Sequence, residues 1–395
     1  MRKHILLITV LVTIVVTFIQ CTKNTTDAVV NYPAIEAAFG ANINPANFAN
    51  YAGQTKPAYI TKDNAAGFAI NNAKATLGRV LFYDKNLSID NSISCGSCHN
   101  QTFAFGDTAL TSKGVLGGRT ARHSMRLVNV RFAIEPKFFW DERAATLEQQ
   151  TTMPIQDHAE MGFSGQTGRG NLNTVLTKLQ GINYYNELFT IVYGDVAVTE
   201  LRLQECLSNF VRSIQSFDSK FDVGRSQVNN INVNFSNFST IENNGKSLFL
   251  GNANFDANGV RTTGGAGCNQ CHNAPEFDID PNSKNNGIIG KINATGFDLA
   301  ITRSPSLRDL VNNNGLLNGP LMHTGIITSV QAAIGHYNTI IVGPNNNNLD
   351  GRLKPNGFGQ QLNLNAQEMG ALTAFLQTLS GNNIYTDTKW SNPFK

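Results

Sequence analysis

The chain has 395 residues, which is long enough for two or three domains. Its formal net charge is +3 and only 15% of its residues are charged, a balance that argues against nucleic-acid binding through a basic face. Asparagine, glycine and threonine supply most of the polarity, so we expect long polar loops.

The first twenty residues have the pattern of an export signal. A basic start at residues 2–4 is followed by an apolar run at 5–19, which is short for a membrane span. Cys21 stands where this run stops and polar residues begin, so we expect a lipoprotein cleavage site with Cys21 as the lipidated first residue. An uncleaved N-terminal anchor is the alternative. Either way, the body of the protein is expected outside the cytoplasm, in the periplasm.

A Cys-x-x-Cys-His motif occurs twice, as Cys95, Cys98 and His99 and again as Cys268, Cys271 and His272. The spacing lets both thiols reach one edge of a porphyrin while the next residue presents its imidazole to the iron, as in c-type haem attachment. A single copy would also fit a redox dithiol or half of a zinc site. Because both copies end in histidine in an exported chain, we predict two haems c with the two histidines as iron ligands.

Helical periodicity dominates the remaining sequence. An amphipathic segment at 77–84 leads into the first motif, and apolar residues at steps of three and four run through 172–217. Ser239 and Asn365 are each followed three positions later by glutamate, which is typical of a helix start. Cys206 lies on the apolar face of its segment and is expected to be a buried, inert thiol.

These patterns repeat around each motif: a helix, Cys-x-x-Cys-His, a long loop and a closing helix. No strand pattern is strong, so we predict an all-α chain of two cytochrome c-type domains, each wrapped around one haem. The expected order is an export segment at 1–20, a polar tether at 21–60, an N-terminal peroxidatic domain at 61–225 and a C-terminal electron-transfer domain at 226–395.

On these residues the chain resembles the bacterial di-haem cytochrome c peroxidase family, which includes the MauG-type enzymes. The resemblance runs from about residue 77 to residue 381. Besides both haem motifs it rests on Leu77-Gly78-Arg79-x-Leu81-Phe82, Phe139-Trp140-Asp141-x-Arg143-Ala144, Leu147-x-x-Gln150, Pro154, Glu160-Met161-Gly162, Pro305-x-Leu307-Arg308 and His323-x-Gly325. It implies that the first haem reacts with peroxide and that the second stores and passes electrons.

The resemblance implies three catalytic side chains. Glu160 matches the family's distal acid, Gln150 its distal amide, and Trp140 the tryptophan that relays electrons between the haems. A carboxyl group can take a proton from one peroxide oxygen and return it to the other, and an amide can hold peroxide by hydrogen bonds. Alone, Glu160 would be interpreted as a surface carboxylate, but the ten-residue spacing to Gln150, with Pro154 between them, favours the distal role.

The sixth ligand of the second haem is a methionine in the family's peroxidases and a tyrosine in MauG-type proteins. Fourteen positions after His323 this chain has Tyr337, while the nearest methionine, Met322, directly precedes His323 and is expected to be poorly placed. We therefore predict Tyr337 as the ligand, with His336 as the competing candidate. A phenolate would lower the potential of the iron, whereas a thioether would raise it.

The chain departs from the family at residues 122–125, where Arg-His-Ser-Met replaces the usual Arg-Asn-x-Pro. The family's asparagine helps to bind a calcium ion between the haems, with backbone oxygens that here would come from Asn318 and Pro320. Calcium prefers oxygen ligands, so His123 puts this ion in doubt. His123 is expected to be a hydrogen-bonding residue rather than a displaceable ligand of the first iron. His158 is a further distal candidate, although an ordinary loop histidine is favoured.

Three functions follow from these assignments. The first is reduction of hydrogen peroxide to water at the His99 haem, with electrons from a small cytochrome c or cupredoxin relayed through the His272 haem. The second is a MauG-like oxidase that modifies aromatic residues of a partner protein, which Tyr337 favours. The third is a non-enzymatic di-haem electron carrier, against which Glu160 argues because a carrier has no use for a distal acid. The sequence leaves two questions undecided: whether the protein forms a homodimer and whether it carries a lipid anchor.

Overall fold

The computed structural model describes residues 31–65 and 67–395, so the predicted export segment and Cys21 lie outside the described residues. The helices are α1 (Pro33–Phe39), α2 (Asn72–Tyr83), α3 (Cys95–Cys98), α4 (Leu147–Gln156), α5 (Leu172–Gln180), α6 (Asn183–Tyr193), α7 (Glu200–Ser213), α8 (Lys220–Ser226), α9 (Thr240–Leu250), α10 (Val330–Asn338) and α11 (Ala366–Gln377). The prediction of a mainly helical chain is confirmed, with long loops between the helices.

Two small antiparallel pairs of strands were not expected. In the first, β1 (Ala253–Phe255) pairs with β2 (Arg261–Gly264), and in the second, β3 (His272–Asn273) pairs with β4 (Asp278–Ile279). Strands of two to four residues are too short to leave an alternating pattern in the sequence.

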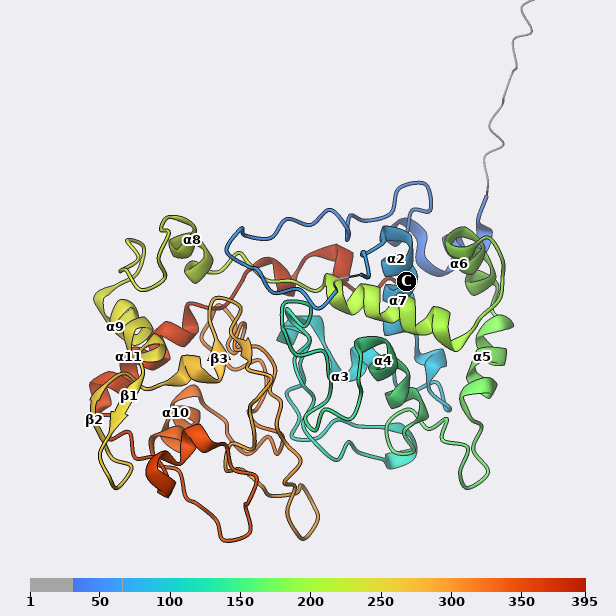
Figure 1. Cartoon of the computed structure of the whole chain (residues 1–395). Helices are drawn as coiled ribbons and strands as arrows, with labels where there is room; N and C mark the ends of the chain where they lie inside the picture. Colours follow the sequence, from blue (N-terminus) through green and yellow to red (C-terminus); the bar gives the residue numbers. More distant parts are fainter. Residues whose placement is uncertain (1–30, 66) are drawn as a thin grey trace, which may run out of the picture.

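The chain folds into two halves that lie side by side (Figure 1). The first half contains α2, α4 and α7, and the second contains α9, α10, α11 and the short strands. One buried apolar cluster draws on residues from Ile35 to Ile214 together with Ile384 and Trp390, and a second draws on residues from Phe221 to Leu379. The first motif lies in the first half and the second motif in the second half.

Each half is centred on a matched pair of helices. Where α2 crosses α7, a Cβ atom on Gly78 would lie 1.9 Å from the carbonyl oxygen of Cys206. Where α9 crosses α11, a Cβ atom on Gly245 would lie 1.9 Å from the carbonyl oxygen of Ala371. Only glycine allows backbones to approach this closely. The repeated plan expected from the sequence is therefore present in the packing of both helix pairs.

The predicted helix starts are confirmed by their capping hydrogen bonds. Ser239 accepts a hydrogen bond from the N–H of Glu242, whose side chain accepts one from the N–H of Ser239. Asn365 and Glu368 form the same reciprocal pair at the start of α11. Cys206 is fully buried in α7, as expected for an inert thiol.

The predicted polar tether at 21–60 contains a helix that was not expected, while residues 43–60 are irregular as predicted. Residues from Pro33 form α1, whose Ile35 and Phe39 side chains are buried in the first cluster. The carboxylate of Glu187 accepts hydrogen bonds from the first N–H groups of α1. The apolar pair four positions apart was a helical signal that the polar composition of the segment obscured.

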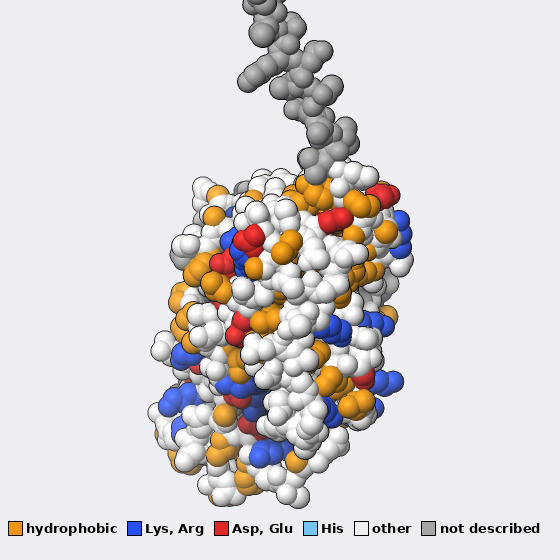
Figure 2. Space-filling model, turned by 90° about the vertical axis from the view of Figure 1, so that its right-hand side faces the viewer, with side chains coloured by type: hydrophobic (Ala, Val, Ile, Leu, Met, Phe, Trp, Pro, Cys, Tyr) orange, Lys and Arg blue, Asp and Glu red, His pale blue; other side chains and the backbone are white. Residues whose placement is uncertain are grey.

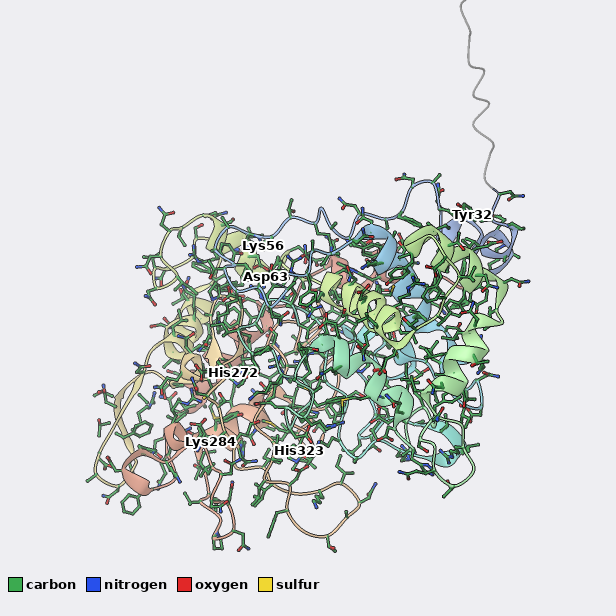
Figure 3. The ribbon with its side chains drawn as sticks, turned by 45° about the vertical axis from the view of Figure 1, so that its right-hand side comes forward. Tyr32, Lys56, Asp63, His272, Lys284 and His323 are labelled. Atoms are coloured by element: carbon green, nitrogen blue, oxygen red, sulfur yellow. The ribbon has the colours of Figure 1, made fainter. Side chains whose placement is uncertain are left out.

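After α1 the same segment runs across the top of both halves (Figure 1), where Figure 3 labels Lys56 and Asp63. The hydroxyl of Tyr59 donates to Asp222 Oδ1 at 2.8 Å, and the N–H of Thr61 donates to Glu276 Oε1 at 2.9 Å. Both acceptors belong to the second half, so this segment ties the two halves together.

The C-terminal residues pack against the first half. The last residues of the predicted domain at 226–395 therefore belong to the core of the other half. Trp390 is buried in the first cluster, and its indole N–H donates to Ser213 Oγ at 3.2 Å. Figure 1 shows the C terminus beside α2. The boundary near residue 225 stays a prediction.

The surface carries charges of both signs. Figure 2 shows basic and acidic side chains interspersed among polar atoms over one face of the protein. Among residues 31–65 and 67–395, no helix is both long and apolar enough to cross a bilayer.

Candidate haem-binding sites

Each Cys-x-x-Cys-His motif lines its own cavity. The first cavity is lined by side chains that the sequence analysis singled out: Cys95, Cys98, His99, Gln150, Pro154 and Glu160. The second cavity is lined by Cys268, Cys271, His272, Met322 and Tyr337. Trp140 and His123 line both cavities. The structure thus brings together residues that are far apart in the chain.

The first motif presents its histidine in a form suited to iron. The backbone turns back after His99 through Ala104 and Phe105, which both have left-handed conformations. His99 Nδ1 lies 3.2 Å from the carbonyl oxygen of Phe105, so Nδ1 carries the proton and Nε2 keeps its free electron pair. Burial lowers the pKa of His99, which favours the neutral imidazole that binds metals.

The second motif offers a less constrained histidine. His272 begins β3, and its buried Nδ1 has no hydrogen-bond partner among the described residues. Burial lowers the pKa of His272 to about 4, so its imidazole is neutral. Figure 3 shows His272 in the interior of the second half.

The four thiols do not have the properties of a redox pair. Burial raises the pKa of Cys95 and Cys268 to about 12, and that of Cys98 and Cys271 to about 11. Redox-active Cys-x-x-Cys motifs instead depend on a lowered thiol pKa. A zinc site is also disfavoured, because the described residues contain no group of three or more histidine, cysteine or acidic side chains placed to hold a metal ion. Two thiols and one neutral imidazole on each cavity fit a covalently attached haem.

Glu160 lies at the wall of the first cavity with its carboxyl group free. Its N–H donates to Asp157 Oδ1 at 3.0 Å and its carbonyl oxygen accepts from the N–H of Val115 at 3.0 Å, so the backbone is fixed. No group in the described part of the chain donates a hydrogen bond to its carboxyl oxygens. Burial, reinforced by the negative charge of Asp157 and opposed by Arg143, raises the pKa of Glu160 to about 7.

Gln150 lines the same cavity from α4. The hydroxyl of Thr146 accepts from the N–H of Gln149 at 3.2 Å and caps the helix. The Gln150 amide has no hydrogen-bond partner within the described residues, so it is available to a small polar ligand. His158, by contrast, does not line the cavity, and its Nδ1 lies 2.9 Å from Ser164 Oγ. The ordinary-loop interpretation of His158 is therefore favoured.

Trp140 stands in the wall between the two cavities. Its Nε1–H donates to the carbonyl oxygen of His123 at 2.7 Å, and its own carbonyl oxygen accepts from the N–H of Arg303 at 3.1 Å. Its ring lies edge-on to that of His323, with 6.2 Å between the ring centroids. The indole is 8% exposed and is therefore fixed within the protein.

His123 is held by the backbone. Its Nδ1 lies 3.0 Å from the carbonyl oxygen of Ala109, and its N–H donates to the carbonyl oxygen of His323 at 2.8 Å. A Cβ atom on Gly319 would lie 3.4 Å from its Nε2, so the ring lies beside the loop of Asn318 and Pro320. This geometry favours the hydrogen-bonding role. It also places an imidazole nitrogen next to the oxygens expected to bind calcium, and nitrogen is a poor ligand for that ion.

The second cavity is lined by two further side chains that could bind iron, Tyr337 and Met322. Tyr337 lines it from α10, and burial raises the pKa of this phenol to about 12. Met322 also lines it, and the expectation that Met322 is poorly placed as a ligand stays a prediction. The side-chain N–H groups of Asn286 donate to Tyr337 Oη and to Met322 Sδ, both at 3.2 Å. His336 does not line this cavity, and its Nε2 lies 2.9 Å from the carbonyl oxygen of Asn286.

Three residues near the cavities were missed by sequence reasoning: Asn286, Arg126 and Arg303. Asn286 lies in an asparagine-rich loop whose composition does not distinguish it. Arg126 belongs to a run of basic residues at 119–131, which gave no indication of which side chain is buried. Local sequence carries no signal for contacts of this kind.

Comparisons with known proteins agree with this geometry. A model of the di-haem cytochrome c peroxidase family matches residues 72–228. The methylamine utilization protein MauG of Methylophilus methylotrophus is 29% identical over 319 residues, which cover 78% of this chain and 82% of the relative. A cytochrome c551 peroxidase of Nitrosomonas europaea is 26% identical over 325 residues, covering 79% and 81%.

Solved structures show the same fold. A MauG-like protein associated with microbial copper homeostasis has a TM-score of 0.64 at 24% identity, covering 86% of this chain and 99% of that one. The diheme peroxidase BthA from Burkholderia thailandensis has a TM-score of 0.57 at 18% identity, covering 87% and 92%. The family match over residues 72–228, the long relatives and the paired motifs agree in what the chain is similar to: di-haem cytochrome c peroxidases, the MauG proteins among them.

Proposed function

We propose that this chain is a di-haem cytochrome c peroxidase that reduces hydrogen peroxide to water at the His99 haem, with electrons relayed from the His272 haem. Two electrons and two protons convert one hydrogen peroxide into two waters. The observation that carries the proposal is that Glu160 and Gln150 line the same cavity as His99, with their polar ends free. The haem iron, when bound, supplies the site where peroxide binds and the electrons that cleave its O–O bond.

We assign proton transfer between the two peroxide oxygens to Glu160. Because its pKa is about 7, both protonation states are well populated at neutral pH. Its carboxylate can accept the proton of one peroxide oxygen, and the resulting acid can return that proton to the other oxygen as water leaves. The Gln150 amide can donate a hydrogen bond that orients the peroxide.

We assign electron transfer between the two haems to residues in the wall between the cavities. Trp140 is buried, is fixed by a hydrogen bond through its indole nitrogen and lines both cavities. These contacts support the relay role that the family resemblance implies. We assign Tyr337 as the residue that would hold the iron together with His272, because Tyr337 lines the cavity whereas His336 Nε2 lies against a backbone carbonyl.

A MauG-like oxidation of aromatic residues on a partner protein is the second candidate function. Tyr337 is the observation that favours it, since a phenolate ligand lowers the potential of the iron and favours oxidised states. Without a reduced donor, such an oxidase would transfer the oxidising equivalents of peroxide to an aromatic side chain of its partner.

The assay that tests the proposal follows peroxide-dependent oxidation of a reduced small cytochrome c by the protein loaded with both haems. We expect turnover by the wild type, loss of most turnover in Glu160→Gln, and unchanged turnover in Glu36→Gln, which removes an exposed carboxylate from α1. Haem content is measured in parallel. No peroxide-dependent oxidation of any reduced donor by the fully loaded wild type would contradict the proposal.

The same assignments give the domain of each haem, the electron donor and the cellular location. We place the peroxidatic haem in an N-terminal domain that begins near residue 61 and the electron-transfer haem in a C-terminal domain that begins near residue 226, while the last residues, Trp390 among them, pack in the first half. The donor is a small cytochrome c or cupredoxin, and the protein acts in the periplasm, held there by lipid on Cys21. Calcium is not part of the proposal because of His123.

A further inference from the structure

Two buried arginines lie in the wall between the cavities without a carboxylate partner. Arg126 is 9% exposed and Arg303 is 7% exposed, and both line both cavities. Within the described residues neither forms an ion pair. A buried cation without a partner is costly, because desolvation of the charge is not offset by an attraction.

The hydrogen bonds of both side chains are incomplete. Arg126 Nη2 donates to the carbonyl oxygen of Ser306 at 3.1 Å, but its buried Nε has no partner. Arg303 makes no side-chain hydrogen bond to the described residues, its Nη1 is buried and unpartnered, and its guanidinium lies 5.0 Å from the ring centroid of Phe138. The charges of Asp309 and Glu135 attract them only from a distance.

Two other buried arginines are paired with a carboxylate, although the Nε of each has no partner among the described residues. Arg308 is completely buried and donates to both carboxylate oxygens of Asp222, at 2.9 and 3.0 Å. Arg212 donates to both carboxylate oxygens of Glu148. A third buried arginine, Arg79, has no ion pair but donates to the carbonyl oxygens of Ser391 and Asn42. Arg126 and Arg303 differ from all three because they line both cavities.

We propose that Arg126 and Arg303 bind the propionate carboxylates of both haems, so that one pair of guanidinium groups serves two cofactors. Each haem brings two propionates, and a guanidinium matches a carboxylate with two parallel hydrogen bonds. The inference rests on the proposed function only in assuming a haem in each cavity. Because Arg303 is also bonded through its N–H to Trp140, the shared anchor adjoins the proposed electron relay.

This placement has an electrostatic consequence that can be measured. A cation beside a propionate offsets its negative charge, and removal of the cation disfavours the reduced state of the nearby iron. In the full protein loaded with both haems, a spectroelectrochemical titration without peroxide should show both midpoint potentials lowered in Arg126→Met and in Arg303→Met. We expect at least a tenfold change in each one-electron equilibrium, which is about 59 mV.

Two controls sharpen the test. Arg131→Met removes a guanidinium that pairs with Asp63 and lines neither cavity, so both potentials should stay at their wild-type values. Arg126→Lys and Arg303→Lys keep the charge, so their potentials should shift less than those of the methionine variants. Wild-type potentials in the methionine variants, a shift of one haem only, or equal shifts for lysine and methionine would each overturn the proposal.

If the methionine variants do not load haem, the lysine variants carry the test through resonance Raman spectra of the propionate groups. A lysine cannot make the two parallel bonds of a guanidinium, so the propionate bending bands should shift; unchanged bands overturn the proposal. Because no peroxide is used, a protein that fails as a peroxidase can still pass or fail this test.

Discussion

The two cavities share an attachment motif but differ in the other polar side chains that line them. In the first, the free carboxyl of Glu160 and the free amide of Gln150 line the wall. In the second, the phenol of Tyr337 and the sulfur of Met322 converge on Asn286. The first arrangement suits a small polar substrate and a proton, and the second suits a ligand that closes the iron. The same attachment chemistry thus acquires two functions from side chains contributed by distant loops and helices.

The scaffold behind this difference is nearly the same in both halves. Gly78 and Gly245 take equivalent places in α2 and α9, each against a backbone carbonyl of the facing helix. The fold therefore holds two similar haem sites, and the functional difference between them can be changed without changing the scaffold. The following experiments use this separation.

The largest effect is expected from Glu160→Gln. Loss of the general acid–base should lower peroxide turnover by about 10²- to 10⁴-fold while both haems stay attached. Steady-state kinetics and the absorbance of the attached haems are the measurements. Unchanged turnover would show that Glu160 is not the general acid–base. The carboxyl group would then not distinguish the function of the first cavity from that of the second.

The next largest effect is expected in the pH dependence of peroxide turnover, which involves a group in the first cavity alone. The proton-accepting carboxylate of Glu160 is the minor form below its pKa of about 7 and the major form above it. The kcat/KM for peroxide should therefore rise about tenfold per pH unit below 7 and level off above it. The Glu160→Gln variant should lose this rise, and the same rise in both proteins would assign it to another group.

Gly245→Ala tests the shared scaffold. The added Cβ would meet the carbonyl of Ala371, so we expect a loss of about 1–3 kcal/mol in unfolding free energy. Gly370→Ala, on α11 where a Cβ would meet nothing within 4 Å, is the matched control and should gain about 0.5–1 kcal/mol. Denaturant unfolding followed by circular dichroism measures both, and equal stability of the two variants would contradict the close crossing.

Tyr337→Phe is expected to have a smaller effect on turnover but a clear effect on the second haem. The low-spin spectrum should change, because the phenol no longer reaches the iron. Met322 then becomes the nearest candidate, and Tyr337→Phe combined with Met322→Leu should leave that haem without a side-chain ligand. A spectrum identical to wild type in Tyr337→Phe would show that Tyr337 is not the ligand and would point to Met322, because His336 does not line this cavity.

The sequence was sufficient for the parts of the site that local spacing defines. Local spacing predicted the helix starts at Ser239 and Asn365, which are confirmed, and the two Cys-x-x-Cys-His motifs. Family resemblance predicted the distal pair of Glu160 and Gln150, which line one cavity with His99 and stay a prediction as catalytic residues. The structure places the predicted cavity residues together.

What the sequence did not predict depends on contacts between distant residues. The amide of Asn286 reaches Tyr337 across 51 positions, and it also brings Met322 into the cavity. Arg126 is one of several basic residues in its segment, and only its burial distinguishes it. The packing of α1 depends on Glu187, more than 150 positions away.

The most direct test of the difference between the cavities is an electron paramagnetic resonance spectrum of the ferric protein before and after one equivalent of hydrogen peroxide. We predict a high-spin signal from an open His99 haem beside a low-spin signal from the His272 haem closed by Tyr337, with the high-spin signal lost when peroxide is added. Two low-spin signals that do not respond to peroxide, even after prior reduction of the protein, would mean that both cavities are closed and would contradict this account.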